Sequence, residues 1–165
     1  MMFRNFAAAL ALATLSLSAC TGGDATASAT KEPVRTIPLT ITSSNGAHAF
    51  VVEVAKTSAE QERGLMYRTN IPKDGGMIFA PYPPEGGAPR EATFWMKNTP
   101  SSLDIIFIRV DGTIAHIAEN AVPFSEDKIP SGEPVAAVLE LNGGRAAELG
   151  IAEGDKVAWP GQGKN

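Results

Sequence analysis

The chain has 165 residues, with 18 acidic and 14 basic side chains and a formal net charge of −4 at pH 7. This length suits one domain with a hydrophobic core, and the acidic balance favours neither nucleic acid nor an anionic surface as a partner. The chain contains a single cysteine, so we expect no intramolecular disulfide to stabilise the domain.

The first 19 residues have the pattern of a secretory signal peptide. Arg4 supplies a positive charge, and residues 6–17 form an uncharged stretch rich in alanine and leucine. A membrane-spanning helix needs about 20 apolar residues. We therefore expect residues 1–19 to be removed rather than to remain as a transmembrane anchor.

Cys20 follows Leu17-Ser18-Ala19, and this segment resembles the lipobox of bacterial lipoproteins. The resemblance implies a diacylglycerol on the Cys20 thiol and a membrane contact through this lipid anchor, which two or more acyl chains make stable. Thr21, not Asp, comes next, which in Gram-negative lipoproteins favours the inner face of the outer membrane. The alternative is a soluble exported protein with an unpaired thiol.

Residues 20–36 contain almost no large apolar side chain and are rich in threonine, glycine, alanine and serine. This composition is typical of a flexible tether. The folded domain is expected at residues 37–160, followed by a disordered tail at residues 161–165. In this arrangement the tether joins a periplasmic domain to its lipid anchor.

The domain begins with two segments of alternating apolar and polar side chains. Residues 39–42 and 48–54 flank the turn sequence Ser44-Asn45-Gly46, which predicts a β-hairpin. Ser58 and Gln61 then form a capping-box pattern, which predicts a short helix.

Further strands are predicted along the rest of the chain. The turn sequence Asp111-Gly112 joins two of them, and a second short helix is expected at residues 144–150, where a glycine ends the segment. Many short strands with little helix predict an all-β fold, a compact sandwich or a jelly-roll-like barrel. The predicted strands are residues 75–79, 92–96, 103–108, 113–117, 135–141 and 156–159.

Five short motifs follow one another along the domain: RGLMYR at residues 63–68, GMIF at 76–79, FWMKNT at 94–99, LDIIF at 103–107 and LELNGG at 139–144. In this order they resemble the prokaryotic family known as domain of unknown function 192. The resemblance extends over about residues 51–159 and implies a compact β-sandwich domain. It brings no established activity, so we assign no catalytic residue from it.

Asp104 interrupts the apolar strand predicted at residues 103–108. A buried carboxylate costs several kcal/mol of free energy unless it is paired or hydrogen-bonded, so we expect a cationic partner. Arg63, Arg68 and Lys97 are the candidates. An arginine can bind a carboxylate through two parallel hydrogen bonds.

Two interpretations of these residues remain open. In the functional one, polar side chains around an aromatic wall formed by Trp95 line a pocket for a sugar or a small anionic ligand. In the structural one, which we prefer, an ion pair between Arg63 and Asp104 holds the short helix on the sheet. The candidate ligand-binding residues are Arg63, Arg68, Trp95, Lys97, Asn98, Asp104 and Glu140.

Asp104 and Glu140 could act as the acid and base of a hydrolase of envelope carbohydrate if both faced one cavity. Glu140 lies on an alternating strand, however, where its side chain could simply face water. The domain contains no triad order, phosphate loop, zinc signature or dinucleotide fingerprint. We therefore expect a monomeric protein that binds a small molecule or an envelope partner without catalysis; a structural accessory module is the third possibility.

We expect no cofactor and no metal site. Met66, Met77 and Met96 could bind Cu(I) through their thioethers if they converged, but methionine also fills irregular gaps in cores. His48 and His116 lie on separate predicted strands and have no cysteine beside them. Core packing is therefore the expected role of the methionines.

Overall fold

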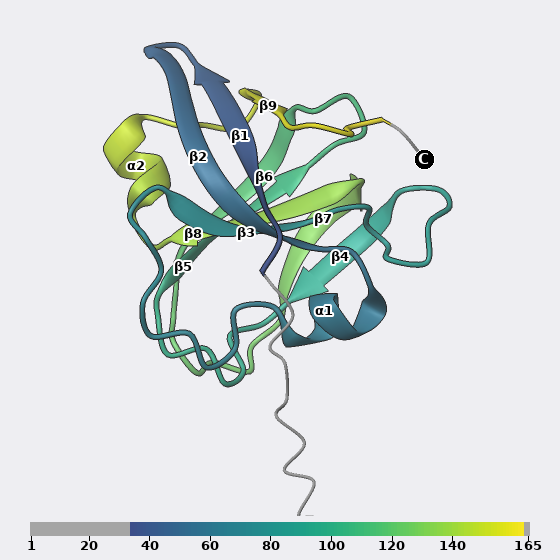
Figure 1. Cartoon of the computed structure of the whole chain (residues 1–165), viewed down its shortest axis with the longest axis vertical. Helices are drawn as coiled ribbons and strands as arrows, with labels where there is room; N and C mark the ends of the chain where they lie inside the picture. Colours follow the sequence, from purple (N-terminus) through teal and green to yellow (C-terminus); the bar gives the residue numbers. More distant parts are fainter. Residues whose placement is uncertain (1–33, 164–165) are drawn as a thin grey trace, which may run out of the picture. The chain divides into compact units, whose positions relative to one another are not determined.

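The computed structural model describes residues 34–163. The predicted signal peptide, Cys20 and most of the predicted tether lie outside these residues. The described part is rich in β-strands and contains two short helices (Figure 1), which confirms the predicted all-β fold class. Neither of these two helices is long and apolar enough to cross a membrane.

Seven strands form one sheet, in the order β6-β5-β8-β3-β2-β1-β9, and β4 and β7 form a separate two-stranded sheet. All neighbouring strands in the large sheet are antiparallel except β2 and β3, which are parallel. Parallel strands need a long crossover connection, and α1 lies in the connection between these two. The elements are β1 (Thr36–Ser43), β2 (Gly46–Ala55), α1 (Ser58–Arg63), β3 (Gly75–Phe79), β4 (Arg90–Phe94), β5 (Leu103–Ile108), β6 (Ile114–Ala121), β7 (Ile129–Val135), β8 (Ala137–Asn142), α2 (Arg145–Leu149) and β9 (Lys156–Ala158).

The large sheet curls until its two edges meet. β9 pairs with β1, and Lys156 of β9 forms a further bridge with Thr113, just before β6. The N–H of Val157 also donates to the carbonyl of Gly112 at 2.8 Å. The sheet thus closes into a small barrel, and closure of this kind removes unpaired sheet edges.

The central strands of the barrel are buried on both faces. Every residue of β3 and β5 is buried, as is every residue of β8 except the last. Ile106 and Leu139 belong to the cluster inside the barrel, whereas Ile105 belongs to a second cluster on the outer face. That outer cluster also contains Ala92 of β4 and Val135 of β7, so the two-stranded sheet covers this face of the barrel.

The strands predicted at residues 75–79 and 103–108 have the bounds of β3 and β5, and the predicted hairpin is formed by β1 and β2. β7 was not predicted from the sequence. Its residues Pro130, Gly132 and Pro134 are depleted in strands, and proline is confined there to edges and irregular positions. An edge strand of a two-stranded sheet accommodates them.

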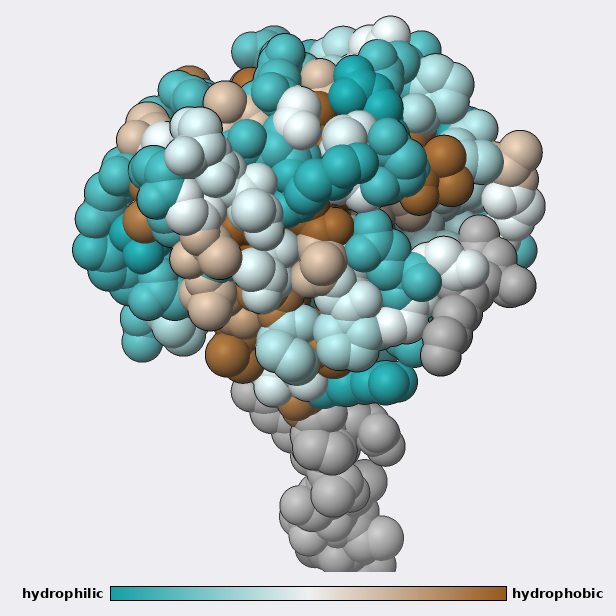
Figure 2. Space-filling model, turned by 90° about the horizontal axis from the view of Figure 1, so that it is seen from above, coloured by the Kyte–Doolittle hydropathy of each residue, from teal (hydrophilic) through white to brown (hydrophobic). Residues whose placement is uncertain are grey.

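One side of the surface mixes residue types closely. Figure 2 shows small hydrophobic areas scattered among hydrophilic ones on that face. The exposed large hydrophobic side chains of the described residues come from several separate segments, since they include Val51, Val110 and Phe124. Scattered exposure of this kind is ordinary for a folded domain.

The capping box of α1 lies one residue earlier than predicted. Thr57 Oγ1 accepts a hydrogen bond from the N–H of Glu60 at 3.3 Å, and the Glu60 carboxylate accepts one from the N–H of Thr57 at 2.8 Å. The predicted pair of Ser58 and Gln61 is therefore wrong. The backbone N–H groups of Thr57 and Lys56 lower the pKa of Glu60, as expected for a carboxylate that accepts such bonds.

Replacement of Thr57 with alanine is expected to lower the free energy of unfolding by about 1 kcal/mol, because the N–H of Glu60 loses its acceptor. Urea denaturation measures the change. Ser58→Ala is the matched control and is expected to change stability by less than about 0.5 kcal/mol. A larger loss in the Ser58 variant than in the Thr57 variant would contradict the assignment of the cap.

Candidate functional site

An open groove of about 1000 Å³ lies beside α1. Its walls come from α1, from the residues that follow it, and from the end of β4 with residues 95 and 97–99. Glu140 of β8 also lines it. The groove therefore lies where α1 and β4 meet the outer face of the barrel sheet.

Glu140 is buried at the base of this groove. Its residue is 5 % exposed and pairs with Met77 of β3 and with Ile105 of β5, so the expectation that it could face water is wrong. Within residues 34–163 no group donates a hydrogen bond to its Oε2 atom. Burial raises the pKa of Glu140 to about 8, so most of its carboxyl groups are protonated at pH 7.

Gln61 of α1 brings a second unpartnered oxygen to the groove. Its Nε2 group donates to the carbonyls of Ala55 at 3.1 Å and Pro81 at 2.8 Å, which fixes the side chain. Its Oε1 atom is buried and accepts no hydrogen bond from the described residues. Buried polar atoms without partners are uncommon in folded proteins, and two of the three found among the described side chains belong to Gln61 and Glu140, which line this groove.

Positive charge gathers around Trp95 on the groove wall. The Nζ atom of Lys128 lies 4.0 Å from the Trp95 ring centre, and that of Lys97 lies 4.9 Å from it, both within cation–π range. Arg63 lines the groove as well. Across residues 34–163, none of these three cations forms an ion pair. Arg63 and Lys97 line the groove themselves, whereas Lys128 contacts Trp95 without lining it.

Acidic side chains offset part of this charge. Glu85 lines the groove and pairs with Arg90 at 2.7 Å, so these two charges largely neutralise one another. Glu62 also lines the groove and is exposed to solvent, where its interactions are screened. Neither Glu62 nor Glu85 forms an ion pair with the cations around Trp95.

Asn98 joins the two loops that form one side of the groove. Its carbonyl accepts the N–H of Tyr67 at 2.8 Å, and its side-chain amide donates to the Met66 sulfur at 3.9 Å. Both Asn98 and Tyr67 have positive φ, at 54° and 63°. Asparagine adopts this conformation more readily than tyrosine, so local strain is concentrated at the groove.

Asp104 lies on the other face of the sheet from Glu140. On β5 it pairs with Leu141, a residue of the barrel core, whereas Glu140 pairs with Ile105 of the outer cluster. The two carboxyl groups therefore do not face one cavity. The acid and base arrangement considered for a carbohydrate hydrolase is not formed by this pair.

The partners of Asp104 are backbone groups. Its carboxylate accepts hydrogen bonds from the N–H of Asn120 at 2.9 Å, of Gly144 at 2.9 Å and of Ala146 at 2.8 Å. The predicted cationic partner is therefore wrong. Gly144 and Ala146 belong to the start of α2, so Asp104 attaches this helix to the barrel.

The structure brings five of the predicted site residues together and separates two from them. Arg68 pairs with Glu53 at 2.7 Å and, like Asp104, does not line the groove. The groove position of Gln61 was not predicted, because its pattern with Ser58 indicates a helix cap. Lys128, which contacts the Trp95 ring but does not line the groove, lies in a segment without a motif. The predicted residues that line the groove are Arg63, Trp95, Lys97, Asn98 and Glu140.

The methionines have different environments. Met77 and Met96 are buried in the outer cluster, and Met66 lines the groove. No group of three histidine, cysteine or acidic side chains in the described part of the chain could hold a metal ion.

β4 ends at Phe94, so Trp95 and Met96 lie beyond the strand predicted to contain them.

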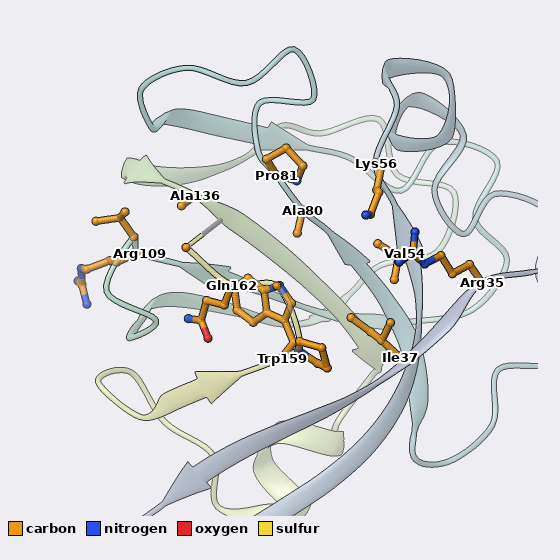
Figure 3. Close-up of a pocket in the computed structure, with 14 residues that line it drawn as sticks. Arg35, Ile37, Val54, Lys56, Ala80, Pro81, Arg109, Ala136, Trp159 and Gln162 are labelled. Atoms are coloured by element: carbon orange, nitrogen blue, oxygen red, sulfur yellow. The ribbon is translucent and has the colours of Figure 1, made fainter. Parts of the chain in front are cut away.

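A second cavity, of about 140 Å³, lies next to the chain's last described residues. Arg109, on its wall, is held by Glu133 through a hydrogen bond of 3.2 Å from Nη2 to Oε2. This cavity admits only a small group, so the larger groove is the better candidate site. Figure 3 shows side chains that line the second cavity, among them Arg35, Lys56, Arg109, Trp159 and Gln162.

Two solved structures resemble this one. A protein of unknown function from Novosphingobium aromaticivorans is 48% identical, with a TM-score of 0.73, and the match covers 79% of this chain and 89% of that one. A protein from Sinorhizobium meliloti described as a "putative transcription regulator" is 43% identical, with a TM-score of 0.72 and coverage of 78% and 96%.

No match was found among the curated proteins. A family model does match, over residues 40–159; its family is DUF192, described as an uncharacterized ACR. The matched residues include every strand of the fold except the first part of β1, and they contain all the groove residues discussed above. The chain therefore belongs to the DUF192 family.

Proposed function

We propose that the domain binds a small anionic ligand in the groove and performs no chemistry on it. The observation that carries the proposal is Glu140, a buried carboxyl group with an unpartnered oxygen at the base of an open groove. A buried titratable group with a perturbed pKa in a groove is a candidate site residue. Arg63 and Lys97 on the walls supply the positive charge that an anion requires.

Binding is favoured over hydrolysis by the positions of the carboxyl groups. A glycosidase needs two carboxyl groups that flank one bond, whereas Asp104 is engaged by three backbone N–H groups on the opposite face of the sheet. Glu62 and Glu85 are exposed on the groove walls. No second buried carboxyl group therefore lines this groove to act with Glu140 as an acid and base pair.

The proposal includes the location expected from the sequence. The lipobox resemblance of Leu17-Ser18-Ala19-Cys20 supports a lipid-anchored protein of the periplasm, on the inner face of the outer membrane. Small molecules and envelope fragments of that compartment are then the ligands to test. A transcription regulator would need a nucleic-acid surface, which the net charge of −4 does not favour.

A thermal-shift screen of the purified full chain against phosphate and a panel of carboxylates tests the proposal. A ligand at a hundred times its dissociation constant is expected to add about 2.7 kcal/mol to the free energy of unfolding. Arg63→Met and Lys97→Met are each expected to weaken this effect, because each removes an unpaired cation from the groove.

Arg35→Met is the matched control, since Arg35 is also an exposed cation that forms no ion pair with the described residues, but it lines the second cavity. Its response to the ligand should equal that of the unmodified protein. If no anion changes the melting temperature, the proposal fails. It also fails if the Arg35 variant loses the response and the Arg63 and Lys97 variants keep it.

A further inference from the structure

We infer that the ligand is a hydroxylated carboxylic acid of the sugar-acid class, with its hydroxyl groups donating to Glu140 and Gln61 and its carboxylate held by Arg63 and Lys97. This inference rests on the proposed function and specifies it. In this inference the base and the walls of the groove recognise different parts of the ligand. The base recognises neutral donors, and the walls recognise negative charge.

The base of the groove offers acceptors that lack donors. Glu140 Oε2 and Gln61 Oε1 are both buried and both without a partner among the described residues. A ligand that supplies hydrogen-bond donors satisfies two groups whose burial is otherwise unfavourable. A dicarboxylate offers only acceptors, so it could accept the proton of the neutral Glu140 carboxyl group but would leave Gln61 Oε1 unpaired.

The acceptors are also held in place before any ligand arrives. Two hydrogen bonds from Nε2 to backbone carbonyls fix Gln61, and Glu140 lies in a central strand between β3 and β5. Preorganised groups lose little conformational entropy on binding. Their fixed positions favour a ligand that presents several hydroxyl groups on a rigid ring.

Both acceptors belong to neutral side chains at pH 7. Gln61 carries no charge, and burial raises the pKa of Glu140 to about 8. A buried ammonium needs a charged partner, whereas a hydroxyl group needs only a hydrogen bond. Hydroxyl donors therefore fit this site better than the amine of an amino acid. The other charged or titratable side chains that line the groove are Glu62, Arg63, Tyr67, Tyr82, Glu85, Arg90 and Lys97.

The aromatic ring of Trp95 is not a free platform for a sugar. The ammonium groups of Lys128 and Lys97 lie over it at 4.0 Å and 4.9 Å. These contacts hold two cations beside the groove, so Trp95 acts by concentrating positive charge rather than by stacking. Recognition of a sugar acid then depends on hydrogen bonds at the base and on charge at the walls.

Isothermal titration calorimetry of the full chain with four probes separates the contribution of the hydroxyl groups from that of the carboxylate. D-glucuronate has hydroxyl groups and a carboxylate, D-glucose has only the hydroxyl groups, glutarate has only carboxylates, and L-glutamate replaces the hydroxyl groups with an amine. Glucuronate is expected to bind at least tenfold more tightly than each of the other three. This comparison uses the unmodified protein and does not depend on any variant.

Two variants test which side chain binds the hydroxyl groups and which binds the carboxylate. Glu140→Leu is expected to weaken glucuronate binding about tenfold, through the loss of one hydroxyl contact, and to leave glutarate binding within twofold. Arg63→Met is expected to weaken both ligands equally. Thermal melting of each variant verifies that it is folded.

The outcomes separate this inference from the proposed function. Equal affinity for glutarate and glucuronate would overturn the inference and leave anion binding intact. Tighter binding of glutamate would overturn it in favour of an amino-acid ligand. If no probe binds and no anion shifts the melting temperature, the inference and the proposed function both fail.

Discussion

Replacement of Asp104 with alanine is expected to lower the free energy of unfolding by about 4 kcal/mol, because three backbone N–H groups lose a charged acceptor at once. Asp104 is 0 % exposed, so water cannot easily replace the carboxylate. The hydrogen bonds run to Asn120 in β6 and to Gly144 and Ala146 at the start of α2. Urea denaturation at pH 7 measures the loss.

Asp104→Asn serves as the matched comparison. Its carbonyl oxygen can still accept the bonds that reach Oδ1, but its amide group would face the N–H of Ala146, which is donated to Oδ2 in the native protein. We expect a smaller loss than for alanine, though still above about 1 kcal/mol. A change below this value in the alanine variant would contradict the structural role assigned to Asp104.

Replacement of Glu140 with glutamine is expected to raise the free energy of unfolding by roughly 3 kcal/mol at pH 7. In the folded protein the pKa of Glu140 is raised from 4.5 to about 8 by burial. Between these two pH values the unfolded chain gives up a proton that the folded protein retains. Stability therefore falls as pH rises through this window, and the loss is complete above pH 8.

Glutamine carries no titratable proton, so the Glu140 variant should lack this part of the pH dependence. Denaturation at pH 4.5, 7 and 9 measures it: the stabilisation should be near zero at the first pH and largest at the last. Glu62→Gln, at an exposed position of the same groove, should leave the pH dependence unchanged. A Glu140 variant with the same slope as the unmodified protein would show that the carboxyl group titrates normally.

These two carboxyl groups illustrate what the sequence could predict. The apolar neighbours of Asp104 on β5 indicate burial correctly, and burial demands a partner. The class of partner could not be predicted, because backbone N–H groups leave no signature in the sequence. Only the fold brings the start of α2 against β5.

The burial of Glu140 was not predicted, for a different reason. The alternation of β8 correctly separates it from Leu139 and Leu141, which face the barrel core. An outward-facing position suggests water unless a second layer covers it. Near Glu140 that layer is formed by α1, the residues after it and the end of β4, which line the groove with it, and no sequence pattern places these segments over β8.

The candidate site was predicted in part. Arg63, Trp95 and Lys97 stand in the motifs that identify the family, and they line the groove. Gln61 lies just before the first motif, where its pattern with Ser58 suggested only a helix cap. Its role depends on a buried oxygen without a partner, which is a property of three-dimensional packing and has no pattern in the sequence.

The closure of the barrel by β9 has a consequence for how the protein is made. Of the strands in residues 34–163, β9 is the last, and it lies between β1, the first of them, and the start of β6. The barrel therefore cannot close until the final residues of the domain have left the ribosome. A shortened chain that ends before Lys156 would keep an open edge on β1, and open edges pair readily with strands of other chains.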